Sequence, residues 1–110
     1  KLHRVFKAMH EELALPFDLA RLAGLAELSE FHFSRVFKQS TGLSPSHYFI
    51  RLRMEEARRL LSETEDSMIS IALTVGYNSP SHFAAIFRKH TGISPSQYRH
   101  ENMRSKTPTA

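Results

Sequence analysis

The sequence contains an internal repeat, and this repeat constrains the fold more than any other feature. The pattern H-F-x-x-[VI]-F-[KR]-x-x-T-G-[LI]-S-P-S-x-Y begins at His32 and occurs again, fifty residues later, at His82. Upstream, Leu22-Ala23 matches Ile71-Ala72 at a separation one residue shorter, so the second copy has one extra residue in its turn. A repeat of this length predicts two copies of one supersecondary unit.

Each copy has the boundaries of a short helix, a turn and a longer helix. A helix N-cap uses a side-chain oxygen, and four suitable residues precede the predicted helices: Asp18, Ser29, Ser67 and Ser79. Gly42 and Gly92 follow the longer helices, where glycine can take the left-handed conformation that ends a helix. Ser44-Pro45 and Ser94-Pro95 then begin new helices, with serine as N-cap and proline as the first helical residue. Each copy is therefore predicted to be a helix-turn-helix unit.

The segment between the two copies predicts one long helix. It runs from Pro45 to about Thr64 without an interior Gly or Pro. Its apolar residues fall on one stripe: Phe49, Leu52, Ala57, Leu60 and Leu61. Its arginines fall mostly off that stripe: Arg51, Arg53, Arg58 and Arg59. At a rise of 1.5 Å per residue such a helix is about 30 Å long.

The fold class predicted from these patterns is all-α, because strand signals are absent. We expect two helix-turn-helix subdomains joined by a long linker helix, with about seven helices. The double helix-turn-helix domain covers residues 1–100, divided into a first unit 1–44, a linker helix 45–64 and a second unit 65–100. Residues 101–110 are rich in Ser, Thr, Lys and Pro and are predicted to form a flexible tail.

Charge and composition narrow the classes of function. Fifteen Lys and Arg against eleven Asp and Glu give a formal charge of +4, which favours a polyanionic partner. The chain has no Cys, which excludes disulfides and thiolate metal sites. It has neither a signal peptide nor an apolar segment of the length that crosses a bilayer, so we expect no membrane contact and a cytoplasmic location. It opens on an amphipathic run without an initiator Met, which predicts a fragment of a longer protein.

The outward faces of the two longer helices are the candidate binding surfaces. Phe33, Val36 and Phe37 recur at helical spacing and are predicted to face the core, as are their counterparts in the second copy. The first helix then presents Glu30, Phe31, Ser34, Arg35 and Lys38, and the second presents Pro80, Ser81, Ala84, Ala85 and Arg88. Arg can take guanine O6 and N7 in a major groove, and an aromatic ring can meet a thymine methyl.

Three other interpretations stay open at this point. Arg35 can be an ordinary surface residue beside a half-buried Phe31. The domain can be a helical protein-interaction module with Phe31 as its anchor. An enzyme whose catalytic domain lies elsewhere is the third. The chain itself predicts no catalytic residue, cofactor or metal site: nucleophile-elbow, Walker and dinucleotide motifs are missing, and the seven His lack a zinc spacing.

The second copy carries a more specific pattern, I-A-x-x-x-G-Y-x-S-x-S-H-F-x-x-x-F-R-x-x-x-G-x-S-P-x-x-Y-R, from Ile71 to Arg99. Over residues 1–100 the chain resembles the DNA-binding domain of the AraC/XylS family of bacterial transcription regulators. The resemblance implies sequence-specific binding of double-stranded DNA, nucleoid association and regulation of transcription. Recognition helices at about 29–41 and 79–91 would enter adjacent major grooves. RNA polymerase and an effector or dimerisation domain outside this fragment are the other implied partners.

The resemblance also assigns roles to individual residues. Base contacts fall on Phe31, Ser34 and Arg35 in the first unit and on Pro80, Ser81, His82 and Ala85 in the second. Phosphate contacts fall on basic residues and helix N-termini: Lys38, Ser44, Arg88, Lys89 and Ser94.

The sequence departs from the family pattern in two places. Glu27 stands where the first turn often has Gly, and a differently shaped first turn is expected. Ala85 replaces a polar reader, so we expect the second unit to contribute mainly phosphate and shape contacts while Arg35 supplies base discrimination. Successive major-groove faces lie about 34 Å apart, close to the length of the linker helix, so one chain could span both. Because the units differ, the site of one monomer should be asymmetric.

Overall fold

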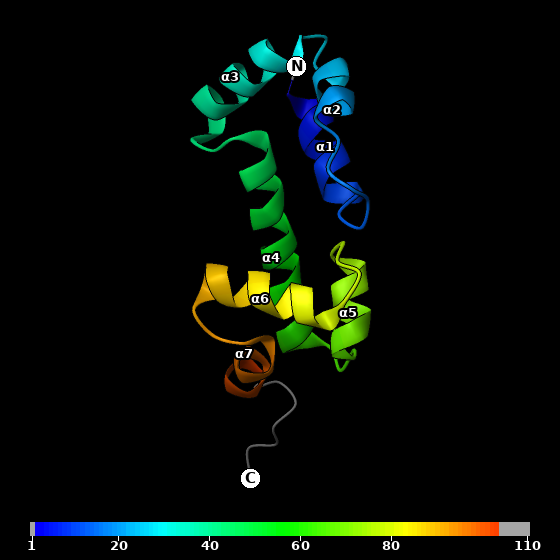
Figure 1. Cartoon of the computed structure of the whole chain (residues 1–110), viewed down its shortest axis with the longest axis vertical. Coiled ribbons are helices and arrows are strands. Elements are labelled where there is room, and N and C mark those ends of the chain that lie inside the picture. The colour runs from blue at the N-terminus through cyan, green and yellow to red at the C-terminus, as the bar shows by residue number, and fades with distance from the viewer. Residues whose placement is uncertain (1, 104–110) are drawn as a thin grey trace. The chain divides into compact units, whose positions relative to one another are not determined.

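The computed structural model describes residues 2–103, and within them it contains seven helices and no strand (Figure 1). The helices are α1 (His3–Glu11), α2 (Leu19–Leu25), α3 (Glu30–Thr41), α4 (Pro45–Glu63), α5 (Met68–Thr74), α6 (Pro80–Thr91) and α7 (Pro95–Asn102). The predicted all-α fold with two helix-turn-helix pairs is confirmed. The tail was predicted to begin at residue 101, but α7 continues through Asn102, and residues 104–110 lie outside the described part.

The chain divides into two compact units, and the division falls inside α4, between Leu52 and Arg53. Unit 1 holds α1, α2, α3 and the beginning of α4, while unit 2 holds the rest of α4 with α5, α6 and α7. The predicted linker helix is therefore part of both cores. Phe49 and Leu52 are buried in the core of unit 1, and Ala57 and Leu61 are fully buried residues of unit 2.

The core of unit 1 is built around aromatic rings. Phe33 and Phe37, one turn apart on α3, are both fully buried, as the sequence predicts. The ring of Phe37 lies 5.5 Å from that of Phe6 on α1 and 5.2 Å from that of Tyr48 on α4. These contacts attach α3 to both neighbouring helices. The outer side of α3 is left to solvent.

Unit 2 repeats this core at matching positions. Phe83 and Phe87 are buried on α6, and the ring of Phe87 lies 5.6 Å from that of Tyr98 on α7. The second half of α4 stands before α5 in unit 2, in the position that α1 has before α2 in unit 1. It contributes the buried residues Leu60 and Leu61 to the core of unit 2. One long helix thus supplies the last helix of the first unit and the first helix of the second.

The capping residues expected from the sequence are in place. Asp18, Ser29, Ser67 and Ser79 each accept a hydrogen bond from the backbone N–H three residues later, at 3.1 to 3.2 Å. Gly42 and Gly92 have φ of 84° and 88°. Each donates its N–H over 2.8 Å to a carbonyl four residues earlier, which closes the longer helix. The boundaries of both recognition helices are therefore set by local chemistry.

Candidate nucleic-acid interface

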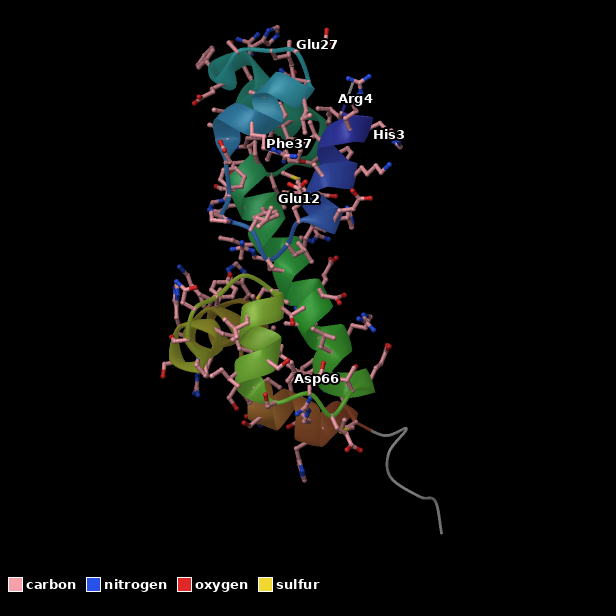
Figure 2. The ribbon with its side chains drawn as sticks, turned by 90° about the vertical axis from the view of Figure 1, so that its right-hand side faces the viewer. His3, Arg4, Glu12, Glu27, Phe37 and Asp66 are labelled. Carbon is pink, nitrogen blue, oxygen red and sulfur yellow. The ribbon has the colours of Figure 1, made fainter. Side chains whose placement is uncertain are left out.

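The turn between α2 and α3 sets the direction in which α3 leaves the first helix of its pair. The Leu28 N–H donates over 3.0 Å to the carbonyl of Ala23, five residues earlier, and thereby pairs a carbonyl that the end of α2 leaves open. The residue before it, Glu27, has φ of 61°. Figure 2 labels Glu27 together with His3 and Arg4, which line the same shallow cavity of about 270 Å³.

The turn between α5 and α6 has the same hydrogen bond. The Tyr77 N–H donates over 2.8 Å to the carbonyl of Ala72, and the preceding Gly76 has φ of 94°. The extra residue of the second copy, Asn78, lies between Tyr77 and the N-cap of α6. Up to that extra residue the two turns are alike, so the expectation that Glu27 in place of Gly would change the shape of the first turn is wrong. Glu27 adopts the left-handed conformation that glycine takes in the second copy, at a cost of about 1–2 kcal/mol for a residue with a Cβ.

The outer face of α3 exposes the residues that the sequence selected. The side chain of Phe31 is 77% exposed, Arg35 is exposed, and Ser34 is half-buried. The alternative of a half-buried Phe31 is thereby excluded. The ring of Phe31 contributes little to the stability of the folded unit, because apolar surface stabilises a protein only when it is removed from water. An exposed aromatic ring of this kind is typical of a surface that a partner covers.

A shallow hollow of about 420 Å³ follows this face of α3. It is lined by Phe31, Ser34, Arg35, Lys38, Gln39 and Ser44. Five of these residues were selected from the sequence. Gln39 was missed, although it is exposed and lies one turn after Arg35. Its amide can donate and accept, which suits either a base edge or a phosphate.

The outer face of α6 has a different character. Pro80, Ser81, His82 and Ala85 are all exposed, and Ala84 is half-buried. Of these, only Ser81 and His82 carry a polar side chain. The imidazole of His82 packs edge-on against the ring of Tyr77, with 5.2 Å between the ring centroids. His82 therefore lies against the turn that precedes α6.

The structure contains a buried arginine that the sequence analysis placed off the apolar stripe. Arg53 on α4 is 8% exposed, and its guanidinium carbon lies 5.3 Å from the centre of the Tyr77 ring. Burial lowers the pKa of Arg53, and the neighbouring Tyr77 hydroxyl opposes that shift. Burial likewise raises the pKa of the Tyr77 phenol. The Tyr77 ring is therefore in contact with both the buried Arg53 guanidinium and the exposed His82 imidazole.

The basic residues assigned to phosphates are exposed to solvent. Within residues 2–103, no carboxylate forms an ion pair with Lys38, Arg88 or Lys89. By contrast, Arg21 and Arg59 are paired with Glu12 and Glu56. A phosphate that binds these cations therefore competes with no internal carboxylate of the described residues.

The two serines assigned to phosphates begin α4 and α7. Ser44 and Ser94 accept the N–H groups of His47 and Gln97 at 3.3 and 3.1 Å, so both hydroxyls act as N-caps. Each hydroxyl keeps its own hydrogen to donate. Both side chains are half-buried, and only Ser44 belongs to the hollow along α3.

Arg99 ends the specific pattern of the second copy, and its contacts are internal. Its Nε donates over 3.0 Å to the carbonyl of Leu61, and a terminal nitrogen donates over 3.1 Å to that of Thr64. A cation at these open carbonyls closes the C-terminus of α4. In the first copy the equivalent position is Phe49, a core residue in the interior of an unbroken helix.

Two other kinds of site are absent from residues 2–103, the described part of the chain. It contains no group of three or more His, Cys, Asp or Glu side chains arranged to hold a metal ion. None of its helices combines the length and apolar character needed to cross a membrane.

Known proteins share this architecture. The family model described as "Helix-turn-helix domain" matches residues 22–101. The DNA-binding domain of AdpA, solved in complex with a target DNA, is 33% identical, with a TM-score of 0.87 over 99% of this chain and 97% of that one. A transcriptional regulator from Chromobacterium violaceum, described as containing an AraC-type DNA-binding domain, is 30% identical, with a TM-score of 0.85 over 98% and 94%.

Among curated proteins, the MmsAB operon regulatory protein of Pseudomonas aeruginosa is 38% identical over 70 residues, which are 64% of this chain and 23% of that protein. The chain spans about a quarter of the length of the curated relatives it matches. The fold and the site define a helix-turn-helix DNA-binding domain. The chain belongs to the AraC-type family of such domains, as its sequence motifs predict, and the protein-interaction module is not favoured.

Proposed function

We propose that this domain binds a specific site on double-stranded DNA with α3 and α6 in adjacent major grooves, and thereby regulates transcription. The observation that carries the proposal is the outer face of α3, where an exposed Phe31 stands beside Arg35, whose side chain has no hydrogen bond or ion pair within residues 2–103. Arg35 takes the two acceptors of a guanine, and Phe31 meets a thymine methyl. Ser34 completes the contacts of unit 1 with bases.

Unit 2 holds the domain in place on the duplex more than it distinguishes one base sequence from another. Pro80, Ser81, His82 and Ala85 approach the bases. Pro80 and Ala85 have no hydrogen-bonding side chain, Ser81 can bond to any base, and the His82 imidazole packs against Tyr77, so these positions discriminate less than Arg35 does. Phosphates are held by the cations at the ends of the recognition helices and by the serine caps: Lys38, Ser44, Arg88, Lys89 and Ser94. The last turn of α6 carries Arg88, Lys89 and His90, whereas that of α3 carries only Lys38.

The length of α4 supports the use of two grooves. Its 19 residues correspond to about 28 Å at 1.5 Å per residue, comparable with the spacing of about 34 Å between successive major-groove faces. Because the two recognition faces differ, one chain is expected to bind an asymmetric site. The domain works as a binding module rather than as an enzyme.

The rest of the regulator is part of the proposal as well. The matched relatives are about three times as long as this chain, which supports an effector or dimerisation domain elsewhere in the protein. RNA polymerase is the proposed partner on DNA. The protein works in the cytoplasm at the nucleoid, as do bacterial regulators that bind the chromosome.

Selection from a pool of random duplexes tests this function. We expect the recovered sites to contain two unequal blocks about one helical turn apart, with a guanine in the stronger block. The same selection with Arg35→Ala should lose the guanine preference and keep the spacing. Recovery of a single block, or of no sequence preference at all, would contradict the proposal.

A further inference from the structure

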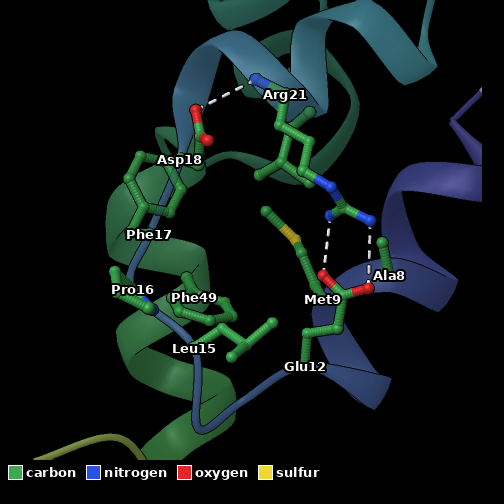
Figure 3. Close-up of a pocket in the computed structure, with 10 residues that line it drawn as sticks. Ala8, Met9, Glu12, Leu15, Pro16, Phe17, Asp18, Arg21 and Phe49 are labelled. Atoms are coloured by element: carbon green, nitrogen blue, oxygen red, sulfur yellow. Dashed lines mark hydrogen bonds and ion pairs between the residues drawn. The ribbon is translucent and has the colours of Figure 1, made fainter.

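Unit 1 contains a cavity that takes no part in the proposed DNA contacts. It has a volume of about 370 Å³ and is enclosed by α1, the loop between α1 and α2, α2 and the beginning of α4 (Figure 3). No residue of α3 lines it. The cavity is therefore formed by the elements that support the recognition helix rather than by the recognition face itself. Sites for small molecules have volumes of about 300–1,000 Å³.

The walls of the cavity are mainly apolar. Met9, Leu22 and Phe49 are buried at its base, and Leu15 is 53% exposed at its opening. The rings of Phe17 and Phe49 lie 5.7 Å apart and are tilted by 44°. Tilted aromatic walls can receive the edge or face of another ring. The thioether of Met9 can adapt to the shape of such a ring.

Three charged residues line the cavity, and two of them are acids: Glu12, Asp18 and Arg21. Glu12 accepts both terminal nitrogens of Arg21, at 2.6 and 3.0 Å, so the guanidinium charge is directed at that carboxylate. Asp18 accepts the backbone N–H of Arg21 through one oxygen. Figure 3 shows both carboxyl groups at the edge of the hollow. The net negative charge disfavours an anionic ligand and favours a neutral or cationic one.

We propose that this cavity binds a small aromatic molecule that is neutral or carries one positive charge. The ring lies among Met9, Leu15 and Phe49, and a cationic group faces Asp18. A ligand that binds only the folded state stabilises unit 1 by mass action. The helix α2 is both a wall of the cavity and the first helix of the helix-turn-helix pair. A bound ligand therefore stabilises the same unit that carries Arg35.

Three probes that share one ring test the chemistry: phenethyl alcohol, phenethylamine and phenylacetate. Each is titrated into the 110-residue chain and followed by NMR at the Met9 methyl and the Leu15 amide. The alcohol and the amine are expected to shift both signals, and the anion should bind about fivefold more weakly, as expected for one like charge nearby. The absence of shifts at these residues with millimolar alcohol and amine overturns the proposal, and so does tighter binding of phenylacetate.

Two variants test the location. Leu15→Trp fills the opening and should abolish the shifts at Met9. The matched control is Ile69→Trp on α5, since Ile69 is 54% exposed and lies outside the cavity, and it should leave binding unchanged. Shifts at Met9 that persist in Leu15→Trp place the probe elsewhere and overturn the site.

A third variant tests the charge without filling the cavity. Asp18→Asn keeps a good N-cap for α2 but removes one negative charge. It should reduce the preference for phenethylamine over phenylacetate, and an unchanged preference overturns the assigned cationic position.

Discussion

The two helix-turn-helix units have the same internal construction and different outer faces. Both recognition helices have 12 residues, begin after a serine N-cap and end at a left-handed glycine. Their exposed positions differ: Phe31, Arg35 and Gln39 in α3 correspond to Ser81, Ala85 and Lys89 in α6. The repeat therefore preserves what each unit needs to fold. Exposed positions, which contribute little to stability, are free to differ in function.

The largest effect should fall on the shared core. Phe37→Ala and Phe87→Ala each remove a fully buried ring and should lower the free energy of unfolding of their own unit by about 3–5 kcal/mol. Urea unfolding followed residue by residue by NMR measures the two units separately. Similar losses support equivalent cores, whereas a loss confined to one unit breaks the equivalence.

The next effect tests the difference between the outer faces. Arg35→Ala should weaken binding to the selected DNA site by about 1–3 kcal/mol, because a bidentate contact to guanine is lost, and should weaken binding to random duplex much less. Ser81→Ala removes a polar side chain from the outer face of α6 and should change the affinity little, since unit 2 discriminates less between bases. Fluorescence anisotropy at one salt concentration measures both. Equal losses on specific and random DNA would remove Arg35 from the base contacts.

The turns offer a test of intermediate size. Glu27→Gly should stabilise unit 1 by about 1 kcal/mol, since glycine takes a positive φ without the cost of a Cβ. Gly76→Ala should destabilise unit 2 by a similar amount for the same reason. Thermal unfolding of both variants checks the pair. If Glu27→Gly lowers the stability, contacts of the Glu27 side chain outweigh the backbone cost.

The smallest effect concerns phosphates, and it is measured as a salt dependence. Lys89→Gln removes an exposed cation from α6. The binding constant falls as salt rises, and the variant should reduce the steepness of that fall, the magnitude of the slope of log K against log salt, by about 1. The opposite exchange at the equivalent position of unit 1, Gln39→Lys, should increase the magnitude of the slope by about 1 if that position also reaches a phosphate. Titrations on random duplex at several salt concentrations measure both slopes. An unchanged slope for Lys89→Gln removes this residue from the phosphate contacts.

Much of the interface could be predicted from the sequence because its signals are local. The exposure of Phe31 and Arg35 follows from the burial of Phe33 and Phe37 on the same helix, since helical spacing puts the two pairs on opposite sides. N-caps and glycine stops likewise depend on residues within one turn of each other. Their DNA contacts remain predictions.

Other features depend on residues that are distant in sequence. Arg53 was expected off the apolar stripe, but Tyr77, more than twenty residues later, gives its guanidinium a buried partner. Arg99 closes the end of α4 across a separation of 38 residues from Leu61. The sequence pattern contains Arg99 but does not show whether it faces DNA or the core.

The repeat, the helix boundaries and the exposed face of each recognition helix could be predicted from the amino-acid order, because capping and helical periodicity act within a few residues. The sharing of α4 by two cores, the left-handed conformation of Glu27 and the cavity among the supporting helices of unit 1 became visible only in the folded chain. These features arise where separate segments pack together, and the spacing of residues along the chain does not encode that packing.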